Sequence, residues 1–246
     1  MPTNKFHFKQ FSVSHSASAM KVGVDGVLAA SWATSKIPKN GTFLYGLDMG
    51  CGCGVMALII KQKLQDSKIL GIDIDKDAAE EASDNFQASP WKESLIAIEG
   101  DIKDFCDNQE NHNRFDFIIS NPPFYSEDVL SGNRTRDLAR HQDTLSPESV
   151  IRFSASLLKD RGLVFFICPF SQHERLLELD KRIGLSLREM CHVAHNSSKN
   201  PKRTLMMWQK GLSDEKIKVS FLFLKDKSGL YSDEYKELTQ DYYLAM

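Results

Sequence analysis

An apolar run, a glycine-rich turn and a helical pattern, in this order, constrain the chain more than any other feature. The run Phe43–Asp48 predicts a buried strand, Gly50, Gly52 and Gly54 follow it at alternate positions, and a helix is expected from Val55 to about Gln62. Glycine lets the backbone turn tightly and approach a ligand without interference from Cβ, and the helix N-terminus offers unpaired N–H groups. The pattern is typical of nucleotide-binding α/β folds.

The spacing of the glycines indicates what the loop does not bind. They form a G-x-G-x-G string, whereas the dinucleotide fingerprint ends in G-x-x-G, where the pyrophosphate sits on the helix. A dehydrogenase is therefore disfavoured. A second predicted strand, Lys68–Asp73, ends in a carboxylate about 20 residues beyond the loop, where ribose hydroxyls would be bound. A nucleoside ligand is favoured over a pyrophosphate.

Four consecutive residues, Asn121-Pro122-Pro123-Phe124, follow another apolar run, Phe115–Ser120, that reads as a buried strand. The Asn side-chain oxygen and the Pro122 carbonyl can accept the two N–H bonds of a flat amine- or amide-bearing group, and Phe124 can stack on its face. Two prolines can also merely end a strand. The glycine loop upstream favours the binding interpretation.

Polar residues end several of the predicted strands. Asp101 follows a third strand candidate, Leu95–Glu99, so that Asp48, Asp73, Asp101 and Asn121 would line one rim of the sheet. In an open α/β sheet, ligands bind at the carboxyl ends of the strands, near the point where strand order reverses. The sequence therefore predicts a nucleoside site beside an acceptor for an amino group.

These motifs resemble those of the class I S-adenosylmethionine-dependent methyltransferases that act on amino groups. One family of this class, the bacterial tRNA(Val) adenine-37 N6-methyltransferases, is also resembled in a further set of segments. They are Phe6–Phe11, Met20–Gly26, Ser89–Trp91, Tyr231–Tyr235 and Leu238–Leu244. The family implies an α/β, Rossmann-like class I methyltransferase fold with a mostly parallel seven-stranded sheet, an antiparallel edge hairpin and helices on both faces.

The same resemblance implies a cofactor and roles for individual residues. The cofactor is S-adenosylmethionine, and its methyl group goes to the exocyclic N6 of an adenosine in tRNA, adenine-37 beside the anticodon of a valine tRNA. The residues implied in catalysis are Asn121, Pro122 and Phe124. Those implied in cofactor binding are Asp48, Gly50, Gly52, Gly54, Asp73 and Asp101, with Lys21 and Asp25 at the methionine end.

Other functions remain open. A carboxamide and an aminopurine both present N–H₂, so a protein glutamine N5-methyltransferase would use the same recess, and an rRNA guanine N2-methyltransferase is a further alternative. An RNA-binding protein with an inactive cofactor fold is less favoured, because Asn121 and the glycines are intact.

Net charge does not by itself indicate an RNA partner. The 246 residues carry 31 Lys and Arg against 33 Asp and Glu, whereas nucleic-acid binding draws on phosphate neutralisation. Cations nevertheless gather in two predicted loops. Those predicted to contact the tRNA anticodon stem-loop are Arg134, Arg136, Arg140, Lys199, Lys202 and Arg203. Phe6, Phe8 and Phe11 could stack on bases, but an edge strand that covers the core is favoured.

Length and composition predict an ordinary globular enzyme, with 41% hydrophobic and 26% charged residues. The N-terminal residues lack a signal-peptide core, and no apolar run approaches the ~20 residues of a membrane span. A cytoplasmic monomer that does not bind membranes is expected. Five scattered cysteines fit reduced thiols, and no metal is expected because zinc-ligand spacing is missing.

The chain is expected to divide at residue 40, into an N-terminal extension (1–40) that packs near the active site and a methyltransferase domain (41–246). Beyond the strands already named, one strand is expected over Gly162–Cys168 and a hairpin over Leu187–Ala194 and Thr204–Trp208. A further strand is expected near Ile217–Leu224. Helices are expected over about Ala78–Ala88, from Ser146 to Leu158, and from about Asp233.

Overall fold

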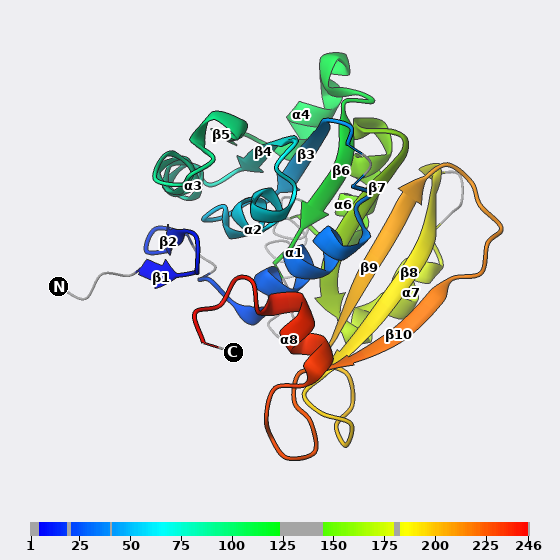
Figure 1. The fold of residues 1–246 in the computed structure, drawn as a ribbon. Coiled ribbons are helices and arrows are strands. Elements are labelled where there is room, and N and C mark those ends of the chain that lie inside the picture. Colours follow the sequence, from blue (N-terminus) through cyan, green and yellow to red (C-terminus); the bar gives the residue numbers. More distant parts are fainter. Residues whose placement is uncertain (1–4, 19–20, 40, 124–144, 180–182, 246) are drawn as a thin grey trace, which may run out of the picture.

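The computed structural model describes residues 5–18, 21–39, 41–123, 145–179 and 183–245. An eight-stranded sheet in the order β10-β8-β9-β7-β6-β3-β4-β5 runs through the molecule (Figure 1). Its strands are β3 (Leu44–Met49), β4 (Ser67–Asp73), β5 (Leu95–Glu99), β6 (Phe115–Ser120), β7 (Leu158–Pro169), β8 (Leu185–Ala194), β9 (Arg203–Lys210) and β10 (Lys218–Phe223).

Neighbouring strands from β5 to β7 are all parallel, whereas β9 runs antiparallel to both β7 and β8. The first strand of the sheet in the chain, β3, has β4 on one side and β6 on the other, so strand order reverses between β3 and β6. Ligands of such sheets bind at the carboxyl ends of the strands beside this reversal.

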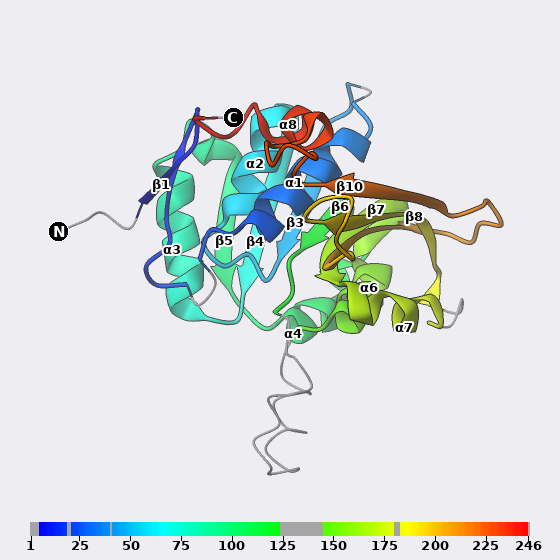
Figure 2. The same ribbon diagram turned by 90° about the horizontal axis from the view of Figure 1, so that it is seen from below.

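Helices cover both faces of the sheet, as Figure 2 shows with α1, α2 and α8 on one side and α4, α6 and α7 on the other. Each face buries its own apolar cluster, one that contains Phe165 and Ile119 and one that contains Phe166 and Ile118, as the alternation of side chains along a strand requires. The helices are α1 (Val24–Lys36), α2 (Val55–Lys63), α3 (Lys76–Gln87), α4 (Ile102–Asp107), α6 (Pro147–Leu157), α7 (His173–Leu177) and α8 (Asp233–Thr239).

The predicted Rossmann-like α/β class is confirmed, but two details of the sheet are wrong. Within the described residues it has eight strands and not seven, and the β8–β9 hairpin is not at the edge, because β10 pairs parallel to β8 outside it. The cause is visible in β10, where Leu222 is only 4% exposed and packs in the cluster shared with α1 and α2. Burial of this side chain fixes the strand to the sheet.

The N-terminal residues form a two-stranded hairpin, β1 (Lys5–His7) and β2 (Ser12–Ser14), followed by α1. Phe8 and Phe11 are buried, and the Phe8 ring stacks on both Phe11 and Tyr243. These aromatic residues therefore cover the core, which is the role that the sequence favoured over base stacking. Helix α1 was not predicted; its small Ala29, Ala30 and Ala33 are buried in one cluster with side chains of α2 and β7. The domain division at residue 40 stays a prediction.

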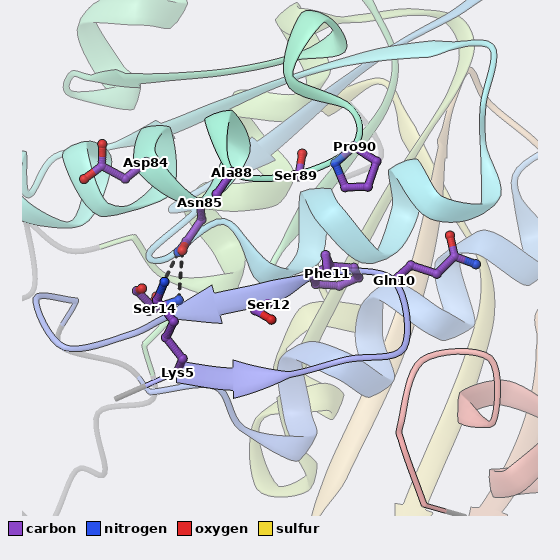
Figure 3. Close-up of a pocket in the computed structure, with 10 residues that line it drawn as sticks. All are labelled: Lys5, Gln10, Phe11, Ser12, Ser14, Asp84, Asn85, Ala88, Ser89 and Pro90. Carbon is purple, nitrogen blue, oxygen red and sulfur yellow. Dashed lines mark hydrogen bonds between the residues drawn. The ribbon is translucent and has the colours of Figure 1, made fainter. Parts of the chain in front are cut away.

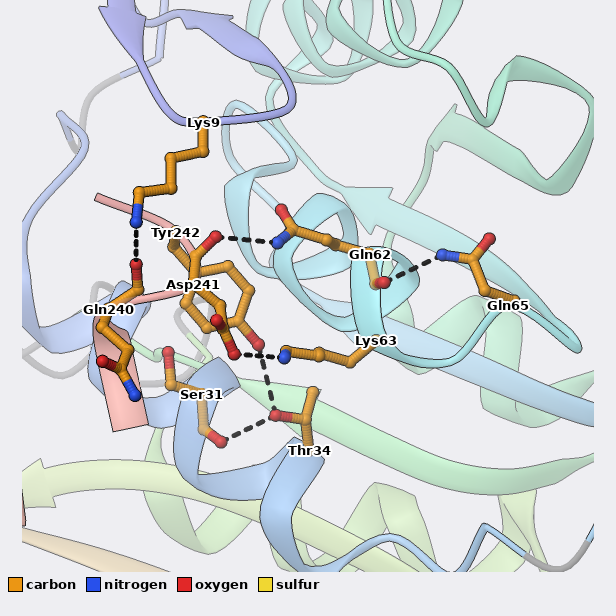
Figure 4. Close-up of polar contacts among 9 residues, drawn as sticks. All are labelled: Lys9, Ser31, Thr34, Gln62, Lys63, Gln65, Gln240, Asp241 and Tyr242. Atoms are coloured by element: carbon orange, nitrogen blue, oxygen red, sulfur yellow. Dashed lines mark hydrogen bonds and ion pairs between the residues drawn. The ribbon is translucent and has the colours of Figure 1, made fainter. Parts of the chain in front are cut away.

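The segment after α8 closes over the first two helices (Figure 4). Tyr242 is 1% exposed and its hydroxyl lies 3.4 Å from Thr34 Oγ1. Gln62 Nε2 donates to the carbonyl of Asp241 at 2.9 Å, and the Asp241 carboxylate pairs with Lys63. These contacts attach the C-terminal residues to α1 and α2.

The cysteines and the helices complete the description of the fold. All five cysteines are buried and free, and in the described ranges no three His, Cys, Asp or Glu residues come together as metal ligands. None of the helices in those ranges is long and apolar enough to cross a membrane.

Candidate active site

The ends of β3 and β6 lie side by side at the point where strand order reverses. Met49 is in register with Ser120, and the Ser120 hydroxyl donates to the Met49 carbonyl at 2.7 Å. The glycine loop leaves β3 directly after this pair, and Asn121 leaves β6 directly after it. The two predicted motifs, about 70 residues apart in the chain, therefore meet at one rim.

The glycine loop is held to the end of the neighbouring strand. The backbone N–H groups of Gly50 and Cys51 both donate to the Ile72 carbonyl, at 2.9 and 3.0 Å. Gly50, Gly52 and Gly54 have φ angles of 72°, 52° and 77°, in the left-handed region that favours glycine.

The space around two of these glycines shows that one is needed for packing and that the other leaves room for a ligand. A Cβ on Gly54 would lie 2.5 Å from the Phe86 ring, so glycine is needed there for α2 to approach α3. A Cβ on Gly52 would meet no described atom within 4 Å. The backbone at Gly52 is thus the open side of the loop, where a ligand can approach.

Asp73 ends β4 and braces this open side. Its Oδ2 accepts from the Gly52 N–H at 2.7 Å and its Oδ1 accepts from the Asp75 N–H at 3.0 Å. A carboxylate has about four lone-pair sites, so further acceptor capacity remains for hydroxyl groups. Asp101, one strand further along the rim, caps α4 by accepting from the Lys103 N–H at 2.8 Å.

Asp48 lies inside the fold, with 0% exposure. Its Oδ2 accepts from the Ala57 N–H at 3.1 Å and so ties the first turn of α2 to β3, while Oδ1 has no partner within the described part of the chain. Burial raises the pKa of Asp48 to about 7, the charge of Asp73 adds to this, and the Ala57 N–H opposes it. The carboxyl is therefore poised between its neutral and charged forms near neutral pH.

Asn121 presents a buried acceptor at the centre of the rim. Its Oδ1 is buried, and none of the described residues donates to it. Its Nδ2 is 3.8 Å from the place where a Cβ would stand on Gly26, in the first turn of α1, so the amide lies at ordinary packing distance from this turn. Pro122 is buried next to it. Phe124 lies outside the described residues.

Asp25 and Arg203, predicted for different roles, form an ion pair with an Nε–Oδ2 distance of 2.7 Å. The pair involves the residue directly before Gly26, whose backbone lies beside the Asn121 amide. It joins α1 to the first residue of β9 and is a feature of the site that sequence reasoning missed.

Lys21 is engaged with the backbone of the loop before α1. Its Nζ donates to the carbonyls of His15 and Ser16 at 2.7 and 3.0 Å. Glu81 of α3 holds the same loop from another side by accepting from the Ser16 and Ser18 N–H groups at 2.6 and 2.9 Å. Burial opposes ionisation of Glu81, but these backbone donors outweigh it and lower its pKa.

The predicted RNA contacts fall in two groups. Lys199 and Lys202 are exposed in the turn between β8 and β9, at the same rim as Asn121 because β9 begins beside the end of β7. Arg203, at the end of that turn, is partly covered by its pairing with Asp25. Arg134, Arg136 and Arg140 lie outside the described residues.

A hollow of about 760 Å³ lies away from these residues, between the N-terminal hairpin and α3 (Figure 3). Lys5, Ser14 and Asp84 are among its lining residues. Asn85, which also lines it, already accepts from and donates to the Ser14 backbone at 2.8 Å. None of the predicted site residues lines this hollow, whereas Asp48, Asp73 and Asn121 meet at the rim, so we take the rim as the candidate site.

Comparison with known proteins shows the family to which the chain belongs. Residues 29–155 match the family described as methyltransferase small domain. A Flavobacterium johnsoniae protein named tRNA1(Val) (adenine(37)-N6)-methyltransferase is 36% identical over 241 residues, which are 98% of this chain and 100% of that protein. The chain belongs to this family of S-adenosylmethionine-dependent methyltransferases.

Other members of the family are similar along their whole length. Proteins with the same name from Phocaeicola vulgatus and Escherichia fergusonii are 35% and 34% identical, covering 100% and 99% of this chain and 100% and 96% of their own lengths. A solved structure from Agrobacterium tumefaciens, described as a predicted O-methyltransferase, matches with a TM-score of 0.64 at 15% identity, over 89% of this chain and 96% of that one. That likeness supports the class I methyltransferase fold.

Proposed function

We propose that this enzyme transfers a methyl group from S-adenosylmethionine to N6 of an adenosine in tRNA, and that the target is adenine-37 of a valine tRNA. The observation that carries the proposal is the buried Asn121 Oδ1, an acceptor without a partner in the described residues, at the rim where strand order reverses. The names of the full-length relatives support the choice of substrate.

The described residues fit a nucleoside cofactor. Gly52 offers a backbone with open space beside it, and Asp73, hydrogen-bonded to that backbone, would accept from the ribose hydroxyls. Gly50 and Gly54 shape the loop, Asp101 would meet the adenine, and Asp48 would order the loop through α2. When bound, S-adenosylmethionine supplies an electrophilic methyl group on a sulfonium centre.

Asn121 and Pro122 would act by orienting the attacking nitrogen. The N6 lone pair of adenine is delocalised into the ring, so hydrogen bonds from N6 to the Asn121 oxygen and the Pro122 carbonyl would turn it toward the methyl group. Positive charge develops on nitrogen as the new bond forms, and the same two acceptors stabilise that charge more than the ground state. The proton can then leave to water, without a dedicated base.

The remaining residues would hold the RNA. A nucleotide in a tRNA loop is already partly unstacked, so it enters a recess at lower cost than a base of a duplex. Phe124 would stack on the adenine, and Lys199, Lys202 and Arg203, with Arg134, Arg136 and Arg140, would face phosphates of the anticodon stem-loop. We place this reaction in the cytoplasm and assign it to a monomer, with Asp25 and Lys21 ordering the segment beside the methionine end.

The test is methyl transfer from labelled S-adenosylmethionine to total tRNA that lacks its native modifications, followed by nucleoside analysis. N6-methyladenosine in a valine tRNA is expected. No label in tRNA, with S-adenosylmethionine still bound, would contradict the proposal and favour the protein carboxamide or rRNA guanine alternative. A variant with Asn121→Ala is the matched control, because it removes the acceptor and keeps the glycine loop.

A further inference from the structure

Four rings pack together at the rim, at some distance from strand β6, which Asn121 follows. Phe170 follows β7, His173 begins α7, His192 lies near the end of β8, and Phe221 lies on the edge strand β10. The ring centroids of His192 are 5.0 Å from Phe170, 4.9 Å from His173 and 5.3 Å from Phe221. We call these four residues the ring cluster.

The inner members of the ring cluster are fixed and its outermost member is exposed. His173 and His192 are each 7% exposed, whereas Phe221 is 59% exposed. His192 Nδ1 lies 3.0 Å from Thr204 Oγ1, and His173 Nδ1 lies 2.5 Å from the Phe170 carbonyl. A large aromatic face is therefore presented to solvent on a rigid backing.

Cations adjoin the ring cluster. The Phe170 N–H donates to the Lys202 carbonyl at 3.0 Å, which brings the exposed Lys202 next to the rings, and Lys199 belongs to the same turn. At the other end of this turn the Lys225 N–H donates to the His195 carbonyl at 2.8 Å, while the Lys225 ammonium lies over the Tyr231 ring and outside the ring cluster. The acid that follows, Asp226, is occupied by backbone N–H groups of its own loop. The neighbourhood thus combines an aromatic face with positive charge.

We propose that the ring cluster, with Lys199 and Lys202, binds a base of the RNA substrate that flanks the target adenosine, with that base stacked on Phe221. Aromatic faces beside cations are how proteins hold unpaired nucleotides. The inference rests on the proposed function for the identity of the RNA. It assigns a substrate subsite to residues that the reaction at Asn121 does not use.

The distance between Phe221 and the strand that precedes Asn121 is short enough for one RNA loop to reach both. Strand order places β7, β9 and β8 between β6 and β10, so Phe221 lies four strand spacings, ~19 Å, from the strand that carries Asn121. A second copy of the chain is a poorer occupant of this edge, because lysines on edge strands oppose pairing of like edges and Lys218 is exposed on β10.

The test compares Phe221→Ala with Phe43→Ala. Phe43 is also exposed, at 49%, and its ring likewise contacts a neighbour, Tyr45 at 5.4 Å, but it lies at the opposite end of the strands. The probes are a fluorescent single-stranded 12-nucleotide RNA and the anticodon stem-loop of a valine tRNA, measured by anisotropy without cofactor. We expect Phe221→Ala to raise the Kd for both about tenfold, Phe221→Tyr to restore most of the affinity, and Phe43→Ala to change neither.

The outcomes separate this inference from the proposed function. If the wild type methylates no tRNA but Phe221→Ala still weakens binding of the 12-nucleotide RNA, the subsite stands and the proposed function fails. Equal affinities of Phe221→Ala and Phe43→Ala would overturn the inference, as would absence of RNA binding by the wild type. So would sedimentation data in which Phe221→Ala converts a dimer to a monomer, since a second copy would then cover this edge.

Discussion

The carboxylate of Asp73 accepts a hydrogen bond from the backbone N–H of Gly52 at 2.7 Å, across two neighbouring strand ends. Gly52 is the open position of the glycine loop, and Asp73 is the acid we propose for the ribose hydroxyls. One side chain therefore both shapes the cofactor loop and offers acceptors to the cofactor. Binding of the ribose and order in the loop should be coupled through this carboxylate.

Replacement of Asp73 by asparagine should weaken cofactor binding. The amide keeps one acceptor for the Gly52 N–H but loses the charge and the second acceptor, so we expect the Kd for S-adenosylmethionine to rise about tenfold to a hundredfold. Titration calorimetry would measure it. Asp77→Asn, an exposed carboxyl in the first turn of α3, is the matched control and should have no effect. Equal losses in the two variants would contradict the role of Asp73.

Asn121→Ala should separate chemistry from cofactor binding. Loss of the buried acceptor at the rim removes an interaction that strengthens in the transition state, so kcat should fall about 100- to 1,000-fold. The Kd for S-adenosylmethionine should stay within about twofold, because the glycine loop and Asp73 are untouched. Single-turnover methylation and calorimetry provide the two measurements. A parallel loss of cofactor affinity would show that the division of roles is wrong.

Much of the rim is predictable from the sequence because it depends on local patterns. Each apolar run predicts a strand, and each polar residue or glycine after a run marks its carboxyl end, so Asp48, Asp73 and Asn121 are found without knowledge of strand order. Parallel strands then bring such ends together by geometry alone. The roles of these residues stay predictions.

The parts that were missed depend on contacts between distant segments. The pair Asp25–Arg203 joins residues 178 positions apart, and no local pattern of charges indicates it. Helix α1 was missed because Gly26 and several Ser and Thr residues weaken its helix propensity, and burial among other helices stabilises it instead. The β8–β9 hairpin was wrongly expected at the edge because a hairpin normally ends a sheet, whereas β10, with its buried Leu222, pairs outside this one.

Charge reversal in the turn before β9 should reveal whether its lysines neutralise phosphates. Lys199→Glu with Lys202→Glu should weaken binding of the anticodon stem-loop and reduce the slope of log Kd against log salt by about 1 for each phosphate that the protein no longer neutralises. Arg203 is left unchanged, because a glutamate there would face Asp25 and disturb the site. Lys68→Glu, at the opposite end of the sheet, is the control. An unchanged slope would make the turn ordinary surface.

The C-terminal segment should contribute to stability through Tyr242. Truncation of this 1% exposed side chain to alanine should cost about 3–5 kcal/mol, whereas Tyr242→Phe, which removes only the long hydrogen bond to Thr34, should cost about 1 kcal/mol or less. Urea unfolding measures both. Equal costs in the two variants would mean that the hydroxyl, and not burial of the ring, attaches the segment.

Asp48 should make stability depend on pH. Its folded pKa of about 7 lies above the ordinary aspartate value of 3.8, so the folded protein holds a proton that the unfolded chain has lost between these values. The contribution of this group to the free energy of unfolding is therefore greatest below about pH 4 and decreases as the pH rises toward 7. Between pH 5 and pH 8 the loss should be about 3 kcal/mol, because the slope of about 1.36 kcal/mol for each pH unit holds only up to the folded pKa near 7.

Asp48→Asn removes this titration and can keep the hydrogen bond from the Ala57 N–H, since an amide oxygen also accepts. The variant should therefore gain stability relative to the wild type as pH rises, with a larger difference at pH 8 than at pH 5. Urea unfolding at several pH values without cofactor would measure that difference, and the exposed Asp77→Asn serves as control. Parallel pH profiles for the wild type and Asp48→Asn would show that the Asp48 carboxyl is already ionised at pH 5 in the folded protein.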